Sequence, residues 1–162
     1  MNFELRKLCE ADIPAVAKIE RECFSSPWSE ATLCSELQNP LNDFFGAFSD
    51  GELAGYIGFQ TVAGETSVFN VAVEKRFRRK GIGKALVEKM IFEAKALGAK
   101  VIFLEVRAGN LAAINLYEKA GFVFFGIRKD YYDKPKENAF ILRLAFDGSQ
   151  ENEDPIECWD EE

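Results

Sequence analysis

The hydrophobic period of this chain changes near its centre, at two glycines, Gly81 and Gly83. Before them, TSVFNVAV (66–73) predicts a strand. After them, apolar residues recur at helical spacing over 82–97, and the glycine at 98 ends the pattern. KVIFLEVR (100–107) is a nearly continuous apolar run, which is typical of a buried strand. A strand, a helix and a strand in this order predict a βαβ unit near the centre of one α/β domain with a mixed sheet.

The flanking segments supply the remaining elements of this domain. Asp12 is expected to cap the first helix, and Asp50-Gly51 predicts a hairpin between two strands. Asn110 is expected to open the last helix, and Gly121 to close it. Further strands are predicted at 3–8, 43–49, 52–62, 122–128 and 139–146, and further helices at 11–24, 29–37 and 111–120.

The length and charge distribution indicate one domain with a short tail. A chain of 162 residues with 48% apolar content fits a single globular domain, expected at 1–146. Residues 147–162 carry eight acids and no Lys or Arg, so the rest of the chain has a net charge near +1 although the total is -7. We expect this acidic tail to be disordered or loosely docked. It would attract a basic partner or, alternatively, fold back onto the basic segment 75–84.

Neither a membrane partner nor a metal is expected. No apolar run approaches the ~20 residues of a membrane span, and the N-terminus lacks a signal-peptide pattern, so a cytoplasmic location is predicted. The four cysteines form no C-x-x-C pair, and histidine is absent. Without histidine, a general base must be a carboxylate, Lys, Tyr, Cys or the backbone acting through water.

Positive charge is concentrated where the central helix begins. Six of the 20 Lys and Arg residues lie within 75–84. A helix N-terminus carries partial positive charge, so these cations are unfavourable there unless an anion binds. Gly81 and Gly83 would let the backbone approach a phosphate or pyrophosphate closely. A Walker A loop is absent, and Leu86 stands where a G-x-G-x-x-G motif needs its third glycine. A basic helix start that is merely solvated is the alternative.

This segment, RRKGIG (78–83), resembles the R-x-x-G-x-G acetyl-CoA signature of the GNAT acetyltransferases. The order of elements over residues 1 to about 146 is also similar to that family. The resemblance implies a mixed, mostly antiparallel seven-stranded sheet flanked by about four helices, with acetyl-CoA as co-substrate at the βαβ unit. The cofactor-binding residues that it implies are Val71, Ala72, Val73, Arg78, Arg79, Lys80, Gly81, Ile82, Gly83, Lys84 and Asn110.

Two further residues are candidates for acid–base chemistry. Glu105 interrupts an apolar strand, where burial would raise the pKa of its carboxyl group and suit it to act as a base. An ion pair with Arg107, two residues further along the same face, is the structural alternative. Tyr117 lies two helical turns after Asn110, on the same face of the helix. A tyrosine at such a position is often only a core residue.

The stretch 105–122, EVRAGNLAAINLYEKAGF, resembles one GNAT branch, the bacterial ribosomal-protein-alanine N-acetyltransferases. PWSE (27–30) and Tyr131-Tyr132 are similar to that branch as well. The resemblance implies acetyl transfer to the N-terminal alanine of a small-subunit ribosomal protein, with Glu105 as base and Tyr117 as acid. The residues expected to bind the N-terminal segment of the protein substrate are Trp28, Glu30 and Tyr132.

Three alternatives remain open at this point. The first is a GNAT enzyme that acts on a small-molecule amine. The second is a catalytically inactive acyl-CoA-binding module, which the presence of both Glu105 and Tyr117 disfavours. The third is a nucleic-acid-binding module, but a pI near 4.8 and one compact basic cluster disfavour direct nucleic-acid binding.

Overall fold

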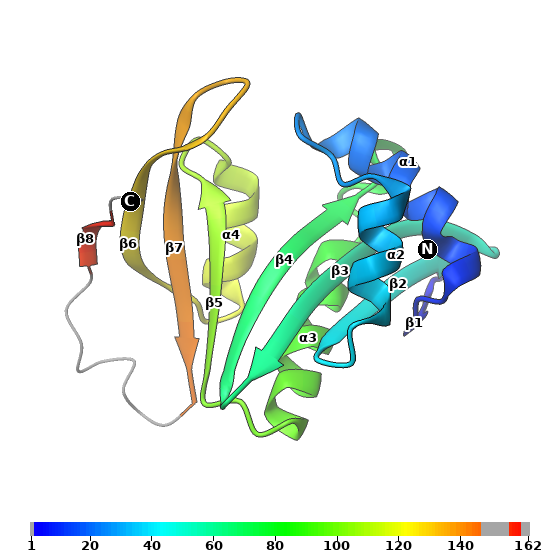
Figure 1. Ribbon diagram of the computed structural model, residues 1–162, viewed down its shortest axis with the longest axis horizontal. Helices are drawn as coiled ribbons and strands as arrows, with labels where there is room; N and C mark the ends of the chain where they lie inside the picture. Colours follow the sequence, from blue (N-terminus) through cyan, green and yellow to red (C-terminus); the bar gives the residue numbers. More distant parts are fainter. Residues whose placement is uncertain (1, 147–155, 160–162) are drawn as a thin grey trace.

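One mixed sheet extends through the computed structural model, which describes residues 2–146 and 156–159 (Figure 1). The strand order is β1-β2-β3-β4-β5-β7-β6-β8. The strands are β1 (Glu4–Lys7), β2 (Asn42–Ser49), β3 (Glu52–Val62), β4 (Glu65–Val73), β5 (Val101–Arg107), β6 (Val123–Tyr132), β7 (Glu137–Ala145) and β8 (Ile156–Trp159). The helices are α1 (Ile13–Cys23), α2 (Glu30–Gln38), α3 (Ile82–Ala96) and α4 (Leu111–Lys119), with short 3₁₀ turns η1 (Glu10–Asp12) and η2 (Lys75–Phe77).

The predicted fold class is confirmed in strands β1–β7 and the four α-helices. Neighbouring strands are antiparallel except for β4 with β5 and β6 with β8. Two details differ from the sequence prediction. β6 continues to Tyr132, because Tyr132 pairs with Glu137 at the start of β7. β8 was not predicted; apart from this strand, the acidic tail lies outside the described residues, and its expected disorder stays a prediction.

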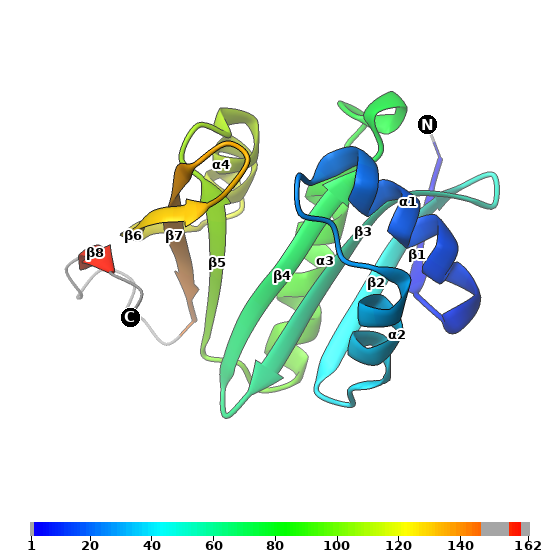
Figure 2. The ribbon, with the colours of Figure 1, turned by 45° about the horizontal axis from the view of Figure 1, so that its top comes forward.

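Two helical layers cover the two faces of the sheet (Figures 1 and 2). Helices α1 and α2 pack on one face of β2–β4, around a core that includes Tyr56 and Ala72. Helices α3 and α4 pack on the opposite face, around a core that includes Ile57 and Val106. The apolar stripe predicted for α3 is buried up to Ala94. Leu97 lies beyond the helix and is exposed instead.

One expected helix cap is wrong in detail. Asp12 directly precedes α1, but its carboxylate does not cap that helix. It accepts hydrogen bonds from the Cys9 backbone N–H at 2.8 Å and from the Arg6 guanidinium at 2.8 and 3.0 Å. The hydrogen bonds from Arg6 are the main reason that the pKa of Asp12 falls to about 2. Asp12 therefore joins strand β1 to the start of the first helical layer.

The two central parallel strands stay together for only three residue pairs. Glu65–Ser67 of β4 pair with Val101–Phe103 of β5, and beyond these residues the strands diverge (Figure 1). In the same region Phe69 is an extra residue in β4, because Gly58 and Phe59 pair with Asn70 and Val68. Such a β-bulge bends a strand locally and redirects its side chains. The divergence leaves the outer edge of β4 without a strand partner beyond Ser67, which places free backbone groups there.

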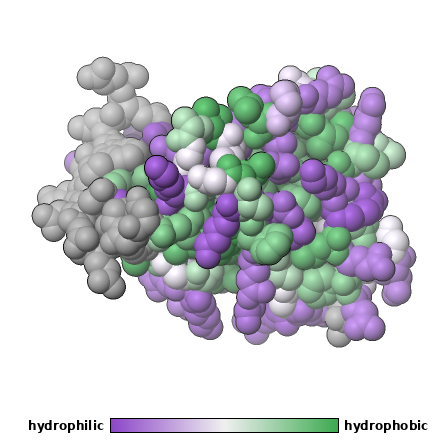
Figure 3. Space-filling model, turned by 90° about the horizontal axis from the view of Figure 1, so that it is seen from below, coloured by the Kyte–Doolittle hydropathy of each residue, from purple (hydrophilic) through white to green (hydrophobic). Residues whose placement is uncertain are grey.

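The outer surface carries scattered apolar side chains. Figure 3 shows hydrophobic and hydrophilic residues interleaved over the face that it presents. Single exposed apolar side chains are normal on a folded protein and need no partner to explain them. The large apolar side chains that are exposed within the described part of the chain are Leu41, Val62, Phe92, Leu97, Leu111, Val123 and Phe124.

Candidate active site

Two glycines at the start of α3 have different structural roles. Gly81 precedes the helix with a left-handed φ of 82°, a conformation that costs other residues about 1–2 kcal/mol. A Cβ atom added at Gly81 would meet nothing within 4 Å, so the space around this turn is open. At Gly83 an added Cβ atom would lie 3.2 Å from the Leu116 side chain, on α4. Gly81 therefore shapes the turn, whereas Gly83 brings α3 and α4 close together.

The six cations around this turn are not equivalent. Arg76 is paired with Glu52 and Glu74. Arg78 donates from Nε to the Val73 carbonyl oxygen at 3.0 Å. Both arginine side chains therefore already have partners within the protein.

Arg79 and Lys80 are exposed and, within the described residues, have no carboxylate within ion-pair distance. Lys84 forms only a long, exposed pair with Glu88, at 3.9 Å. Unpaired cations, open space at Gly81 and the free amides of the first helical turn together suit an anionic group such as a pyrophosphate. The turn thus fits the phosphate portion of acetyl-CoA.

The strand before this turn presents its edge to the gap between β4 and β5. Val71 and Val73 are paired with β3 on one side only, and β5 no longer pairs with β4 at this level. Ala72 faces the core under α1 and α2 and is 5% exposed. The free strand edge can provide backbone N–H groups to a carbonyl oxygen held in the gap.

Glu105 lies on the face of β5 that points away from α3 and α4. Its neighbours Leu104 and Val106 are buried in the core with those helices, so the alternation of the strand turns Glu105 to the opposite face. The expectation of a buried carboxylate is wrong, because about 32% of its side chain is exposed. The ion pair suggested as the structural alternative is also different: Glu105 pairs with Arg128 at 3.4 Å, not with Arg107.

Tyr117 lies on the other side of the sheet. Its side chain is 7% exposed within the core that α3 and α4 form, and its ring meets Phe122 edge-on at 5.8 Å. A tyrosine phenol, with an ordinary pKa of about 10, carries its proton at neutral pH, and burial raises the pKa of Tyr117 further. Within the described residues the hydroxyl has no hydrogen-bond partner. Asn110, on the same helix, caps α4 by accepting from the Ala113 backbone N–H at 3.2 Å.

Tyr132 lies near both Glu105 and Tyr117. Burial, followed by the negative charge of Glu105, raises the pKa of the Tyr132 phenol, and Tyr117 contributes in the same direction. The guanidinium of Arg107 stacks over the Tyr132 ring at 4.4 Å. Tyr131 meets the same ring edge-on at 4.9 Å. Tyr132 is therefore close to Glu105 on one face of the sheet and to Tyr117 on the other.

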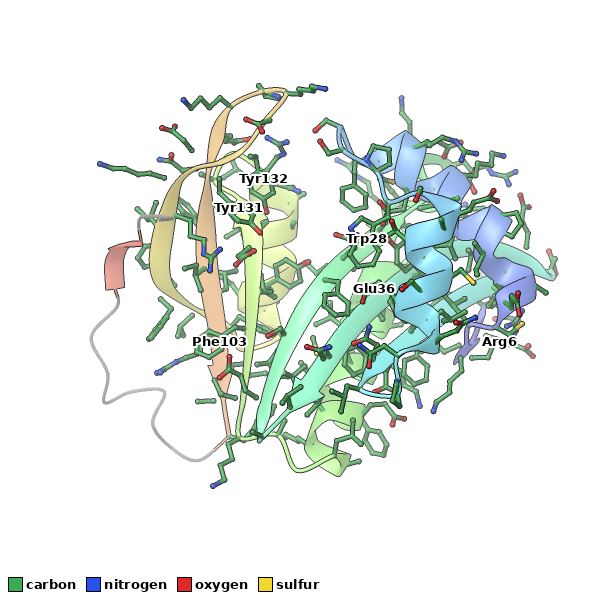
Figure 4. All side chains as sticks on the ribbon, viewed as in Figure 1. Arg6, Trp28, Glu36, Phe103, Tyr131 and Tyr132 are labelled. Carbon is green, nitrogen blue, oxygen red and sulfur yellow. The ribbon has the colours of Figure 1, made fainter. Side chains whose placement is uncertain are left out.

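A cavity of about 290 Å³ opens beside Glu105 on the face toward α1 and α2. Arg128 and Phe103 line it from the β5 side, and Phe69 from the bulge of β4. In Figure 4 the labelled Tyr131 and Tyr132 lie on one side of the gap between β5 and β4, and Trp28 lies on the other. The charged side chains of Glu105 and Arg128 form the polar part of this cavity, and Phe69 and Phe103 form its apolar part.

Arg107 connects the two sides of the gap between β4 and β5. Its guanidinium donates to the carbonyl oxygens of Asp133 at 3.0 Å and Pro135 at 2.9 Å, and to Ser25 Oγ at 3.2 Å. It also pairs with Glu137 at 3.2 Å. The loop between α1 and α2 is thereby joined to the turn between β6 and β7.

Trp28 and Glu30, two of the residues expected to bind the acceptor, lie in different surroundings. The Trp28 ring lies 5.7 Å from that of Phe69, and the Trp28 backbone N–H donates to Glu20 at 3.1 Å. Glu30 is exposed in the first turn of α2, where a negative charge stabilises the helix dipole. Trp28 thus packs against Phe69, which lines the cavity, whereas Glu30 lies where an acid is usual at the start of a helix.

Sequence reasoning missed three charged residues near the site: Arg128, Glu137 and Glu20. A signal for Glu20 was available, because it lies on the apolar stripe of α1 with Ile13 and Val16. The partners of Arg128 and Glu137 come from strands that are distant in sequence, and no local pattern predicts such pairs.

These features, a strand pair that diverges beside a glycine turn, define an acetyltransferase fold, and the chain belongs to the acetyltransferase (GNAT) family, whose profile matches residues 13–122. Acetyl-CoA is the co-substrate of this family, and the chain is an acetyl-CoA-dependent N-acetyltransferase.

Individual relatives are similar over most of the chain. The ribosomal protein bS18-alanine N-acetyltransferase of Escherichia coli strain K12 is 40% identical over 136 residues, which cover 82% of this chain and 90% of that protein. A crystal structure of the ribosomal-protein-S18-alanine N-acetyltransferase from Escherichia coli superposes with a TM-score of 0.84 at 36% identity, covering 94% of this chain and 99% of that one. A chain of the NatC complex, crystallised with a Gag peptide and CoA, gives 0.80 at 25% identity, covering 90% and 99%.

Neither a membrane-spanning helix nor a cluster of metal ligands occurs in the described residues. No helix there is both long and apolar enough to cross a membrane. No group of three or more potential metal ligands occurs in the same part of the chain. Cys9, Cys23 and Cys34 are free thiols.

Proposed function

We propose that this protein transfers an acetyl group from acetyl-CoA to the N-terminal α-amine of a protein, specifically the N-terminal alanine of a small-subunit ribosomal protein. The observation that carries the proposal is the position of Glu105 at a cavity with aromatic walls, on the opposite face of the sheet from Tyr117. The names of the relatives at 34–40% identity support the acceptor. A ribosomal-protein acceptor in turn implies a cytoplasmic location.

Glu105 is proposed to act as the base. An α-amino group has a pKa of about 7.7–8.0, so a large part of it is protonated at neutral pH and must lose a proton before it can attack a thioester. The partly exposed carboxylate of Glu105 can accept that proton directly or through a water molecule. Arg128, which pairs with the carboxylate at 3.4 Å, is proposed to hold it at the cavity.

Tyr117 is proposed to act as the acid. Acetyl-CoA supplies the activated acetyl group, and the departing sulfur needs a proton as the thioester breaks. The Tyr117 phenol is protonated at neutral pH, as tyrosine phenols are, and it lies on the α3 and α4 side, the same side as the glycine turn. The backbone N–H groups at the edge of Val71–Val73 are proposed to stabilise the developing oxyanion.

The acceptor is proposed to enter from the side of α1 and α2. The rings of Trp28 and Tyr132 would contact the first residues of the acceptor. The side chain of Glu30 is exposed, so it could pair with a basic residue further along the acceptor chain. Direct nucleic-acid binding and a membrane partner are not part of this function.

The first experiment compares a peptide that bears an N-terminal alanine with the same peptide acetylated beforehand. We expect release of CoA thiol and a mass gain of one acetyl group for the free amine only. Acetylation of free small amines with no peptide product would contradict the protein acceptor and favour a small-molecule acetyltransferase. Binding of acetyl-CoA without any transfer would favour an inactive acyl-CoA-binding module.

The acid–base assignment predicts two variants of low activity. Glu105→Gln and Tyr117→Phe should each lower kcat by about 10²–10⁴, because each removes one proton-transfer group and keeps the shape of the side chain. Single-turnover rates and near-native melting temperatures would be measured together. Tyr131→Phe is the matched control for a neighbouring phenol and should retain kcat. Near wild-type turnover in either variant would remove that residue from the mechanism.

A further inference from the structure

A buried carboxylate lies behind the acceptor side of the site, and the proposed chemistry does not use it. Glu20, on α1, is 1% exposed. Within the described residues it has no cation within ion-pair distance. Burying a carboxylate without a cation is costly unless hydrogen-bond donors surround the charge. The identity of those donors therefore indicates what this residue does.

Three donors from three elements meet the Glu20 carboxylate. Oε2 accepts from the Trp28 backbone N–H at 3.1 Å, in the loop between α1 and α2. Oε1 accepts from Asn70 Nδ2 at 2.7 Å, on β4, and from the Tyr56 hydroxyl, on β3. One oxygen is thus bound to the loop, and the other is bound to the sheet.

Both connections lead to the wall of the acceptor cavity. Asn70 directly follows Phe69, the extra residue of the bulge in β4. The Trp28 ring packs against Phe69 at 5.7 Å, and Phe69 lines the cavity beside Glu105. A single carboxylate therefore binds the backbone of Trp28 and the side chain of Asn70, the residue next to Phe69.

We propose that Glu20 is a positioning residue for the acceptor: it holds the loop between α1 and α2 against the bulge of β4, so that Trp28 and Phe69 form a preorganised wall for the N-terminal segment of the substrate. The proposal rests on the proposed function for the nature of that substrate. Glu20 itself does not touch the acceptor. Since different residues build the acetyl-CoA turn at α3, loss of this carboxylate should weaken acceptor binding and leave acetyl-CoA binding intact.

Glu20→Gln tests this directly. The amide has nearly the same shape, but only one of its two terminal atoms can accept hydrogen bonds, so it cannot accept from both the Trp28 backbone N–H and Asn70 Nδ2 as the carboxylate does. We expect the KM for the acceptor peptide to rise about tenfold. The dissociation constant of acetyl-CoA should change by less than about twofold.

Tyr56→Phe is the matched control. It removes a donor to the same carboxylate at an equally buried place, but only on the sheet side. Both variants should lower the melting temperature, because each disturbs a buried polar network. Only Glu20→Gln should raise the peptide KM, whereas Tyr56→Phe should keep it within about twofold of wild type.

A second measurement follows the loop without any turnover. The chain has two tryptophans, Trp28 and Trp159, so a Trp159→Phe background leaves Trp28 as the only indole. We expect acrylamide quenching of Trp28 fluorescence to increase about twofold or more in Glu20→Gln, and to stay unchanged in Tyr56→Phe.

Equal changes in the two variants, in either KM or quenching, would show a merely structural role and overturn the proposal. Unchanged quenching in Glu20→Gln would overturn it as well. If wild-type protein acetylates no peptide, the proposed function fails, and the quenching comparison alone still decides whether Glu20 fixes the loop.

Discussion

At the scale of single residues, the charge pairs of Glu105 and Arg107 are set by strand pairing and not by proximity in sequence. Glu105 and Arg107 lie two residues apart on one face of β5, yet each has a different partner. Arg128 and Glu137, from the two strands beyond β5, supply those partners. The result separates their roles: Glu105 faces the cavity, whereas Arg107 joins the surrounding loops.

Asp12 gives a residue-scale prediction of pH dependence. Its pKa is lowered to about 2, mainly by hydrogen bonds from Arg6. The ionised carboxylate therefore stabilises the folded state, and this contribution is complete above about pH 4, where the carboxyl group of the unfolded chain is ionised as well. This contribution should be lost as the pH falls from about 4 to 2. The free energy of unfolding of wild type and Asp12→Asn, measured in urea at several pH values, should differ most above pH ~4 and converge near pH ~2.

A difference between wild type and Asp12→Asn that is constant over this range would contradict the assignment. Glu10→Gln is a suitable control, because Glu10 is an exposed acid in the same 3₁₀ turn. Its effect on stability should be small throughout.

At the scale of elements, the diverging strands and the start of α3 create the site together. The bulge at Phe69 bends β4 beside the gap, and the turn at Gly81 begins α3, the next α-helix after that strand. The gap therefore provides a free strand edge and a helix N-terminus within one βαβ unit. This explains why a single supersecondary unit is able to hold a long phosphate-bearing thioester.

The two glycines of α3 predict opposite outcomes for the same substitution. Gly81→Ala should destabilise the protein by about 1–2 kcal/mol, because φ is 82° there, and should weaken acetyl-CoA binding. Gly83→Ala should have a net effect near zero, because the ~1 kcal/mol gain in helix propensity offsets a contact at 3.2 Å with the flexible end of Leu116. Urea unfolding and acetyl-CoA titration of both variants would measure this, and equal losses in both would contradict it.

At the scale of the whole molecule, charge is distributed unevenly along the chain. The total is -7, and eight acids lie within residues 147–162. That acidic segment would attract a basic substrate electrostatically. Salt screens this attraction, and the screening length is about 10 Å at an ionic strength of 0.1 M.

Removal of residues 147–162 should therefore raise the KM for a basic acceptor peptide at low ionic strength, and the effect should vanish at high salt. A neutral peptide with the same N-terminal alanine is the control and should show no difference. A KM that is independent of salt in both the intact and the shortened protein would exclude steering. Faster acetyl-CoA binding after removal would instead support an acidic segment that competes for the basic turn.

The sequence alone determined the order of the helices and of strands β1 to β7, the central βαβ unit and the family, because these depend on local periodicity and on a glycine motif with little freedom. It also selected Gly81, Glu105 and Tyr117 as candidates. Only the tertiary structure decided how far Glu105 is exposed, which arginine it meets, and that Glu20 connects a loop to a bulge. These features depend on strand pairing between residues far apart in sequence, and a one-residue change of register would turn every side chain to the other face.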